Sequence, residues 1–69
     1  MELKDKVVII TGGADGIGAG MGRAMVKEGA IVVAVDRNPE AGANVLADLQ
    51  QYSPQSSFIE FDGRSIMLH

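Results

Sequence analysis

The stretch TGGADGIG, residues 11–18, decides the fold. It follows Val7–Ile10, where every residue is apolar and β-branched, and it leads into Gly16–Glu28, where apolar residues recur with the period of a helix. A fully apolar run of this length is typical of a strand buried on both faces of a parallel sheet. Glycines between a strand and a helix let the chain turn tightly and let an anion approach the free N–H groups of the helix N-terminus. The stretch therefore predicts a strand, a phosphate-binding turn and a helix in succession.

The helix expected over Gly16–Glu28 has an unusual composition. Ile17, Met21 and Met25 recur on one face, and we expect the two methionines to face the core. Gly29 follows at the position where glycine commonly ends a helix. Three glycines lie inside the segment, at positions 18, 20 and 22. Because glycine weakens a helix, they indicate that something must approach the helix backbone closely.

A second strand and a second helix are expected downstream. The strand Ile31–Val35 is again fully apolar and is followed by Asp36. The tripeptide Asn-Pro-Glu at residues 38–40 has the order of a helix start: an N-cap residue, a proline at the first helical position and an acid in the first turn. The segment Ser-Pro-Gln-Ser at residues 53–56 interrupts this helix, and we expect Tyr52 to pack at its end.

A third strand is expected over Ser57–Phe61, followed by Asp62. Gly63–His69 has no clear period, and we expect a loop or a frayed end there. The elements predict an α/β fold, a partial Rossmann fold of the βαβαβ type, with a three-stranded parallel sheet in the order 3-2-1. Because the crossovers are right-handed, both helices are expected on one face of the sheet. The other face and the outer edge of the first strand should be bare, which would favour self-association.

The spacing of the glycines separates the candidate motifs. The pattern G-x-G-x-x-G does not occur, and no lysine follows the loop as a P-loop requires. What occurs is T-G-x-x-x-G-x-G, with glycines at positions 12, 16 and 18. This motif, continued by Asp36-Arg37 and by Asp62 after the third strand, resembles the opening of the short-chain dehydrogenase/reductase family. The resemblance covers residues 4–62 and implies that residues 1–69 are the N-terminal part of an NAD(P)-binding Rossmann domain whose catalytic half is absent.

The resemblance gives the glycine loop a role in binding a cofactor. It implies that Gly12, Gly16, Ile17 and Gly18 line the pyrophosphate and the adjoining ribose of a dinucleotide. Asp15 stands where the family most often has serine, or a basic residue in members that use NADP. An acid at this position should disfavour an additional phosphate. A tight glycine turn without any ligand is the alternative interpretation of the loop.

The acids at the strand ends extend the expected site. A carboxylate at Asp36 can accept hydrogen bonds from the adenosine ribose and repels a 2′-phosphate, so NAD is expected over NADP. Two unit charges about 4 Å apart interact by roughly 4 kcal/mol at an intermediate dielectric constant. Arg37 supports the alternative, because an adjacent guanidinium can bind that phosphate. Asp62 resembles the family acid that contacts the adenine amino group, with the backbone of Gly63 beside it; a turn residue at the strand end is the other interpretation of Asp62.

The catalytic residues of the family are missing from this chain. The family uses a Tyr-x-x-x-Lys pair, in which the tyrosine acts as acid or base. Tyr52 is the only tyrosine, and Ser56 occupies the position of the lysine, so we assign no catalytic residue. We expect the nucleotide-binding portion of an NAD-dependent alcohol or ketone oxidoreductase, inactive as this chain. A non-catalytic nucleotide-binding or interaction fragment, and an unstable remnant without function, are the alternatives.

The composition excludes several classes of binding partner and indicates where the protein is located. The net charge is −3 and the six basic residues are scattered, which argues against a nucleic-acid partner. The chain has no cysteine, and His69 is its only histidine, so we expect no metal site and no disulfide. The apolar runs are too short to span a bilayer, and the N-terminus does not resemble a signal peptide. We therefore expect a cytoplasmic protein with a single small core in its 69 residues.

Overall fold

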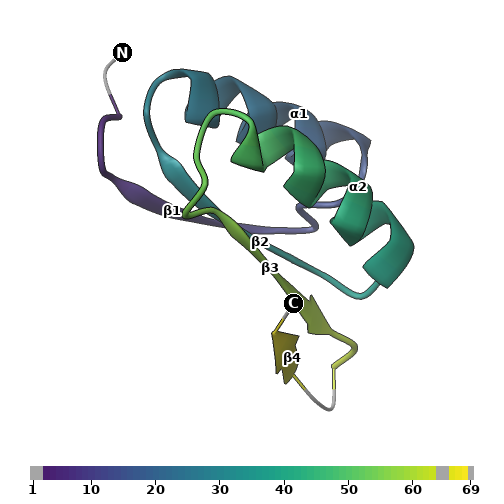
Figure 1. Cartoon of the computed structure of the whole chain (residues 1–69). Coiled ribbons are helices and arrows are strands. Elements are labelled where there is room, and N and C mark those ends of the chain that lie inside the picture. Colours follow the sequence, from purple (N-terminus) through teal and green to yellow (C-terminus); the bar gives the residue numbers. More distant parts are fainter. Residues whose placement is uncertain (1–2, 64–65, 69) are drawn as a thin grey trace.

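Two successive β–α–β crossovers build the chain, as a computed structural model describes for residues 3–63 and 66–68 (Figure 1). The strands of these crossovers are β1 (Val7–Thr11), β2 (Ile31–Asp36) and β3 (Ser57–Phe61). The helices are α1 (Gly16–Lys27) and α2 (Pro39–Gln50). All three strands are parallel, and β2 lies between β1 and β3. The predicted α/β class and the succession of elements are confirmed.

The sheet has a fourth strand that the sequence did not predict. Residues Ile66–Leu68 form β4, which pairs antiparallel with β3 and gives the order β1-β2-β3-β4. The three predicted parallel strands are present, but the expectation of a loop or frayed end over Gly63–His69 was wrong for residues 66–68, which add an antiparallel strand to the sheet. Residues 64, 65 and 69 lie outside the described part of the chain. A three-residue strand is too short to show an alternating pattern, and its pairing covers the otherwise free edge of β3.

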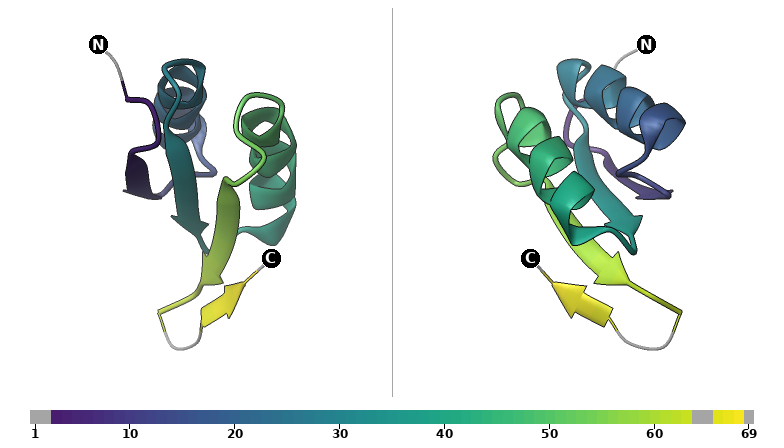
Figure 2. Two further views of the ribbon diagram at one scale, coloured as in Figure 1. Left: turned by 60° about the vertical axis from the view of Figure 1, so that its left-hand side comes forward. Right: turned by 90° about the vertical axis from the view of Figure 1, so that its right-hand side faces the viewer.

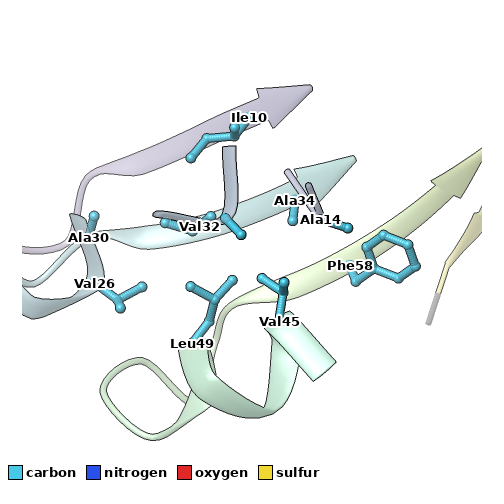
Figure 3. Close-up of a cluster of buried hydrophobic side chains, with 10 residues drawn as sticks. Ile10, Ala14, Val26, Ala30, Val32, Ala34, Val45, Leu49 and Phe58 are labelled. Atoms are coloured by element: carbon cyan, nitrogen blue, oxygen red, sulfur yellow. The ribbon is translucent and has the colours of Figure 1, made fainter. Parts of the chain in front are cut away.

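Both helices cover the same face of the sheet, as expected (Figure 2). Successive side chains of a strand point to opposite faces, and here the even-numbered positions face the helices. Val32 and Phe58 are almost completely buried on this face, and Val45 and Leu49 of α2 pack on them (Figure 3). The core is therefore a single layer between the sheet and the two helices.

The face of α1 that meets the sheet differs from the predicted one. Gly18, Ala19, Gly22 and Val26 are the buried residues of this helix, whereas the side chain of Met21 is 46% exposed. The prediction that Met21 faces the core was therefore wrong. The small residues determine the orientation, because they let the helix backbone approach the sheet and α2 closely. Ile17 is likewise 83% exposed, and Met25 is half-buried against the core.

The helix ends follow the sequence signals. The Asn38 side chain accepts hydrogen bonds from the N–H groups of Glu40 and Ala41, both at 3.1 Å, and Pro39 is the first helical residue of α2. At the end of α1, Gly29 has a φ of +94°. This left-handed conformation lets the N–H group of Ala30 reach back to the carbonyl oxygen of Met25 at 3.1 Å, which closes a Schellman motif.

The face of the sheet opposite the helices is apolar and open. Val7 and Ile9 of β1 are 64% and 67% exposed, and Phe61 of β3 is 43% exposed. Among the described strands, β1 pairs with β2 alone, so its other edge carries no strand. The expected bare face and free edge of the first strand are thus present, and they lie next to the glycine loop that follows β1.

Candidate functional site

The loop between β1 and α1 presents open backbone at two glycines. Gly12 has a φ of +69°, a left-handed conformation that favours glycine. A Cβ atom built on Gly12 or on Gly16 would meet no atom within 4 Å. Ligand atoms can therefore approach the main chain at both positions.

The N-terminus of α1 adds a positive electrostatic end to this loop. The helix starts at Gly16, and its first turn contains no acid. The N–H groups of a first turn have no partner inside the helix and carry part of the positive end of its dipole. Asp15 is the N-cap residue: its carbonyl oxygen accepts the N–H of Ala19 at 2.7 Å, and its side chain makes no cap hydrogen bond. An anion above the loop would meet Gly16, Ile17 and Gly18 through their N–H groups.

The other two glycines of the loop are needed for packing. A Cβ atom on Gly18 would overlap the carbonyl oxygen of Gly12. A Cβ atom on Gly13 would lie 2.8 Å from both the Cβ of Ala34 and the carbonyl oxygen of Ile10. Gly13 thus lets the loop lie on β2, and Gly18 lets α1 lie on the loop. The four glycines divide into two that face open space and two that hold the loop in place.

Asp36, the last residue of β2, lies against the loop. One carboxylate oxygen, Oδ2, accepts the N–H of Ala14 at 3.0 Å. The other, Oδ1, accepts the N–H of Arg37 at 2.7 Å and that of Asn38 at 3.3 Å. Asp36 is half-buried, whereas Arg37 is exposed. The structure thus brings together two predicted parts of the site, the loop and the acid after the second strand.

Asp62 and Gly63 follow β3 and are exposed. The carboxyl ends of parallel strands lie at the same edge of a sheet, so these residues share an edge with Asp36 and the glycine loop. In the register of the sheet, Asp36 pairs with Glu60, which places Asp62 beyond the level of Asp36. All the residues predicted for the site are therefore at one edge, with Asp62 and Gly63 at its far side.

Comparison with known proteins identifies the family. The family described as short chain dehydrogenase matches residues 6–66. The chain belongs to this family. It is 40% identical over 58 residues to the 3beta-hydroxysteroid dehydrogenase of Mediterraneibacter gnavus, a match that covers 84% of this chain and 21% of that protein. It is 42% identical over 64 residues to the 15-hydroxyprostaglandin dehydrogenase [NAD(+)] of Homo sapiens, over 90% of this chain and 24% of the relative.

Solved short-chain dehydrogenase structures share the fold. L-Sorbose reductase from Gluconobacter frateurii, complexed with NADPH and L-sorbose, superimposes with a TM-score of 0.82 at 28% identity, over 90% of this chain and 24% of that one. Cj0485 dehydrogenase superimposes with a TM-score of 0.78 at 38% identity, over 87% of this chain and 22% of that one. This chain therefore spans less than a quarter of the length of these four relatives.

The short-chain dehydrogenase family implies a nicotinamide dinucleotide, NAD or NADP, as the cofactor. The glycine loop fits such a group on geometric grounds. Gly12 and Gly16 face open space, and the first turn of α1 offers N–H groups and contains no acid of its own, with Asp15 preceding it as the N-cap residue. These are the two features that a pyrophosphate needs at a helix N-terminus.

A groove continues from the loop along the free edge of β1. It has a volume of about 510 Å³, and its lining includes Gly12, Asp15, Ile17, Ile9 and Met21. A second groove of about 410 Å³ adjoins it and shares Met21 with it. Ile9 and Met21 were not predicted from the sequence as residues of the site. The available signal was the spacing of Gly18, Gly22 and Val26, which repeats every four residues and so places these three on one side of the helix. Met21 does not belong to this series, which indicates that it lies off the packed side.

Neither a membrane-spanning helix nor a metal-holding cluster occurs among the residues that the structure describes. No helix there has the length and the apolar character needed to cross a membrane. In the same residues, no group of three or more His, Cys, Asp or Glu side chains is arranged to hold a metal ion.

Proposed function

We propose that the chain is the nucleotide-binding part of an NAD-dependent oxidoreductase of alcohol or ketone groups. The observation that carries this proposal is the position of Asp36 beside the glycine loop. Its carboxylate oxygen Oδ2 lies 3.0 Å from the backbone nitrogen of Ala14, whose N–H donates to it. The N–H groups of Gly16, Ile17 and Gly18, with the open backbone at Gly12, would hold the pyrophosphate. Asp36 would then accept a hydrogen bond from the adenosine ribose on the same side of the loop.

The charges of the site favour NAD over NADP. The names of the relatives do not decide between the two, since the human relative is named for NAD(+) and the L-sorbose reductase structure holds NADPH. Asp36 and Asp15 both add negative charge where a 2′-phosphate would come close to the loop. Arg37, next to Asp36, is exposed, so water screens its charge more strongly than that of the half-buried acid. The balance of these charges supports NAD.

The remaining residues of the site would serve the adenine, and none would serve the chemistry. Asp62 and the backbone of Gly63, at the far side of the edge, would contact the adenine ring. A bound NAD accepts a hydride at its nicotinamide ring. Tyr52 has no lysine four residues later, so this chain contributes binding residues only, and we propose that it is inactive by itself.

Calorimetric titration of the 69-residue chain with NAD and with NADP tests this function. We expect NAD to bind about tenfold or more tightly than NADP, because a screened part of the charge repulsion opposes the 2′-phosphate. Asp36→Ser should weaken NAD binding and narrow the difference between the two cofactors. Asp48→Ser removes the same charge from the Arg23 ion pair, away from the loop, and should leave both affinities unchanged. Tighter binding of NADP than of NAD by the unaltered chain would contradict the preference.

A second candidate function is self-association through the bare face of the sheet. Val7 and Ile9 expose most of their apolar side chains there, and such patches mark interaction surfaces. Sedimentation of the chain should show concentration-dependent dimers that Ile9→Lys abolishes. Ala47→Lys introduces the same charge at an exposed position of α2 and should leave the dimers intact. A monomer at all concentrations would rule this candidate out.

A further inference from the structure

The glycine loop is joined to β2 by two consecutive N–H groups. The N–H of Gly13 donates to the carbonyl oxygen of Val35 at 3.1 Å, and the N–H of Ala14 donates to Asp36 Oδ2 at 3.0 Å. The first bond continues the pattern of the sheet, whereas the second depends on a side chain. Ala14 is only 8% exposed and Asp36 is half-buried, so this second bond is partly shielded from water. A hydrogen bond to an ionised carboxylate is also stronger than one between neutral groups.

The bond from Ala14 comes at the centre of the open part of the loop. Gly12 lies two residues before Ala14 and Gly16 two residues after it, and these are the positions with open space at the main chain. Inside the loop, the N–H of Asp15 donates to the carbonyl oxygen of Gly12 at 3.2 Å, which is a long hydrogen bond. The bond to Asp36 therefore helps to fix how Gly12 and Gly16 are presented to a phosphate.

Asp36 can hold the loop and still bind a ligand. An ionised carboxylate has about four lone-pair sites for hydrogen bonds. The N–H groups of Ala14, Arg37 and Asn38 use three of them. One site is left for a ribose hydroxyl group, and the three N–H donors fix the carboxylate in the orientation that presents it.

We propose that Asp36 is a positioning residue for the glycine loop, in addition to being an acceptor for the ribose. This inference rests on the dinucleotide-binding function proposed above. It separates two effects of Asp36 on affinity: one through the ribose hydroxyl groups, and one through the loop that receives the pyrophosphate. Replacing Asp36 should therefore weaken the binding even of a dinucleotide whose adenosine ribose offers no hydroxyl group to the carboxylate.

Two measurements on the 69-residue chain test the proposal. In the first, NAD and an analogue whose adenosine ribose lacks both hydroxyl groups are titrated into the unaltered chain, Asp36→Ala and the control Asp48→Ala. We expect Asp36→Ala to weaken binding of the analogue by roughly threefold or more, through the loop alone. Equal affinities of the unaltered chain and Asp36→Ala for the analogue would overturn the proposal.

The second measurement needs no ligand, so it remains decisive if the proposed binding function fails. Amide hydrogen exchange at Ala14 is followed by NMR in the free chain and in both variants. We expect exchange at this amide to become about tenfold faster in Asp36→Ala and to stay unchanged in Asp48→Ala. The amide of Val26, a buried residue near the C-terminal end of α1, is the internal reference and should be unaffected by either variant. Unchanged exchange at Ala14 in Asp36→Ala would overturn the positioning role even if NAD binds.

Discussion

Gly18 packs so closely on Gly12 that a Cβ atom at position 18 would overlap the Gly12 carbonyl oxygen. The contact joins the first turn of α1 to the loop that precedes it. Because the obstacle is backbone, no side-chain rotation can relieve it. The glycine at position 18 is therefore required by the shape of the loop itself, before any ligand is considered.

Substituting this glycine should destabilise the fold. We expect Gly18→Ala to lower the free energy of unfolding by about 2–3 kcal/mol, because the added methyl group forces the loop and helix apart. Gly20→Ala is the matched control, since a Cβ atom at position 20 meets nothing within 4 Å and alanine favours a helix. It should raise the free energy of unfolding by about 0.5–1 kcal/mol. Urea denaturation measures both, and equal effects of the two substitutions would refute the packing role of Gly18.

A second close contact lies in the core, between α2 and β3. A Cβ atom on Gly42 would overlap the ring of Phe58, which is 1% exposed. We expect Gly42→Ala to lower the free energy of unfolding by about 1–3 kcal/mol. Phe58→Leu by itself should also lower the free energy of unfolding. Combined with Gly42→Ala, however, the smaller leucine side chain should relieve part of the overlap with the new methyl group. A double-mutant cycle measured by urea denaturation should therefore show favourable coupling, and simple additivity would count against the contact.

The start of α2 offers a matched test of capping. Asn38→Ala removes the side-chain oxygen that accepts two N–H groups, so it should lower the free energy of unfolding by about 1 kcal/mol. Asn44→Ala makes the same substitution at an exposed position inside the helix, where alanine is favoured. It should leave the stability unchanged or raise it slightly. Thermal denaturation compares the two, and a smaller loss for Asn38→Ala than for Asn44→Ala would argue against the cap.

Local signals in the sequence were sufficient for the elements and for the loop. The apolar strands, the helix start at Asn38-Pro39 and the helix end at Gly29 depend on residues close in the chain, and the structure has all of them. The strand β4 was not predictable in the same way. It depends on pairing with the free edge of β3, and three residues carry too little pattern to reveal such a partner.

The orientation of α1 does not follow the hydrophobicity of its residues. Large apolar residues predicted a buried face containing Met21, yet the helix packs through Gly18, Gly22 and Val26. Hydrophobicity ranks methionine above glycine, but close packing of a helix on a sheet favours the smaller residue. The bond from Ala14 to Asp36 was also missed, because it joins a backbone N–H to a side chain 22 positions away. The glycine motif located the loop, but only the structure shows what holds it.

The central claim is that the loop and Asp36 form a dinucleotide site in this chain. Thermal denaturation of the 69-residue chain with and without NAD tests it most directly, since a ligand that binds only the folded form raises its stability. Gly16→Val fills the open space of the loop, and Gly20→Val adds the same side chain to the same helix away from it. The account predicts a cooperative transition that NAD shifts upward in the unaltered chain and in Gly20→Val, but not in Gly16→Val. No shift by NAD in the unaltered chain, or an equal shift in Gly16→Val, would contradict it.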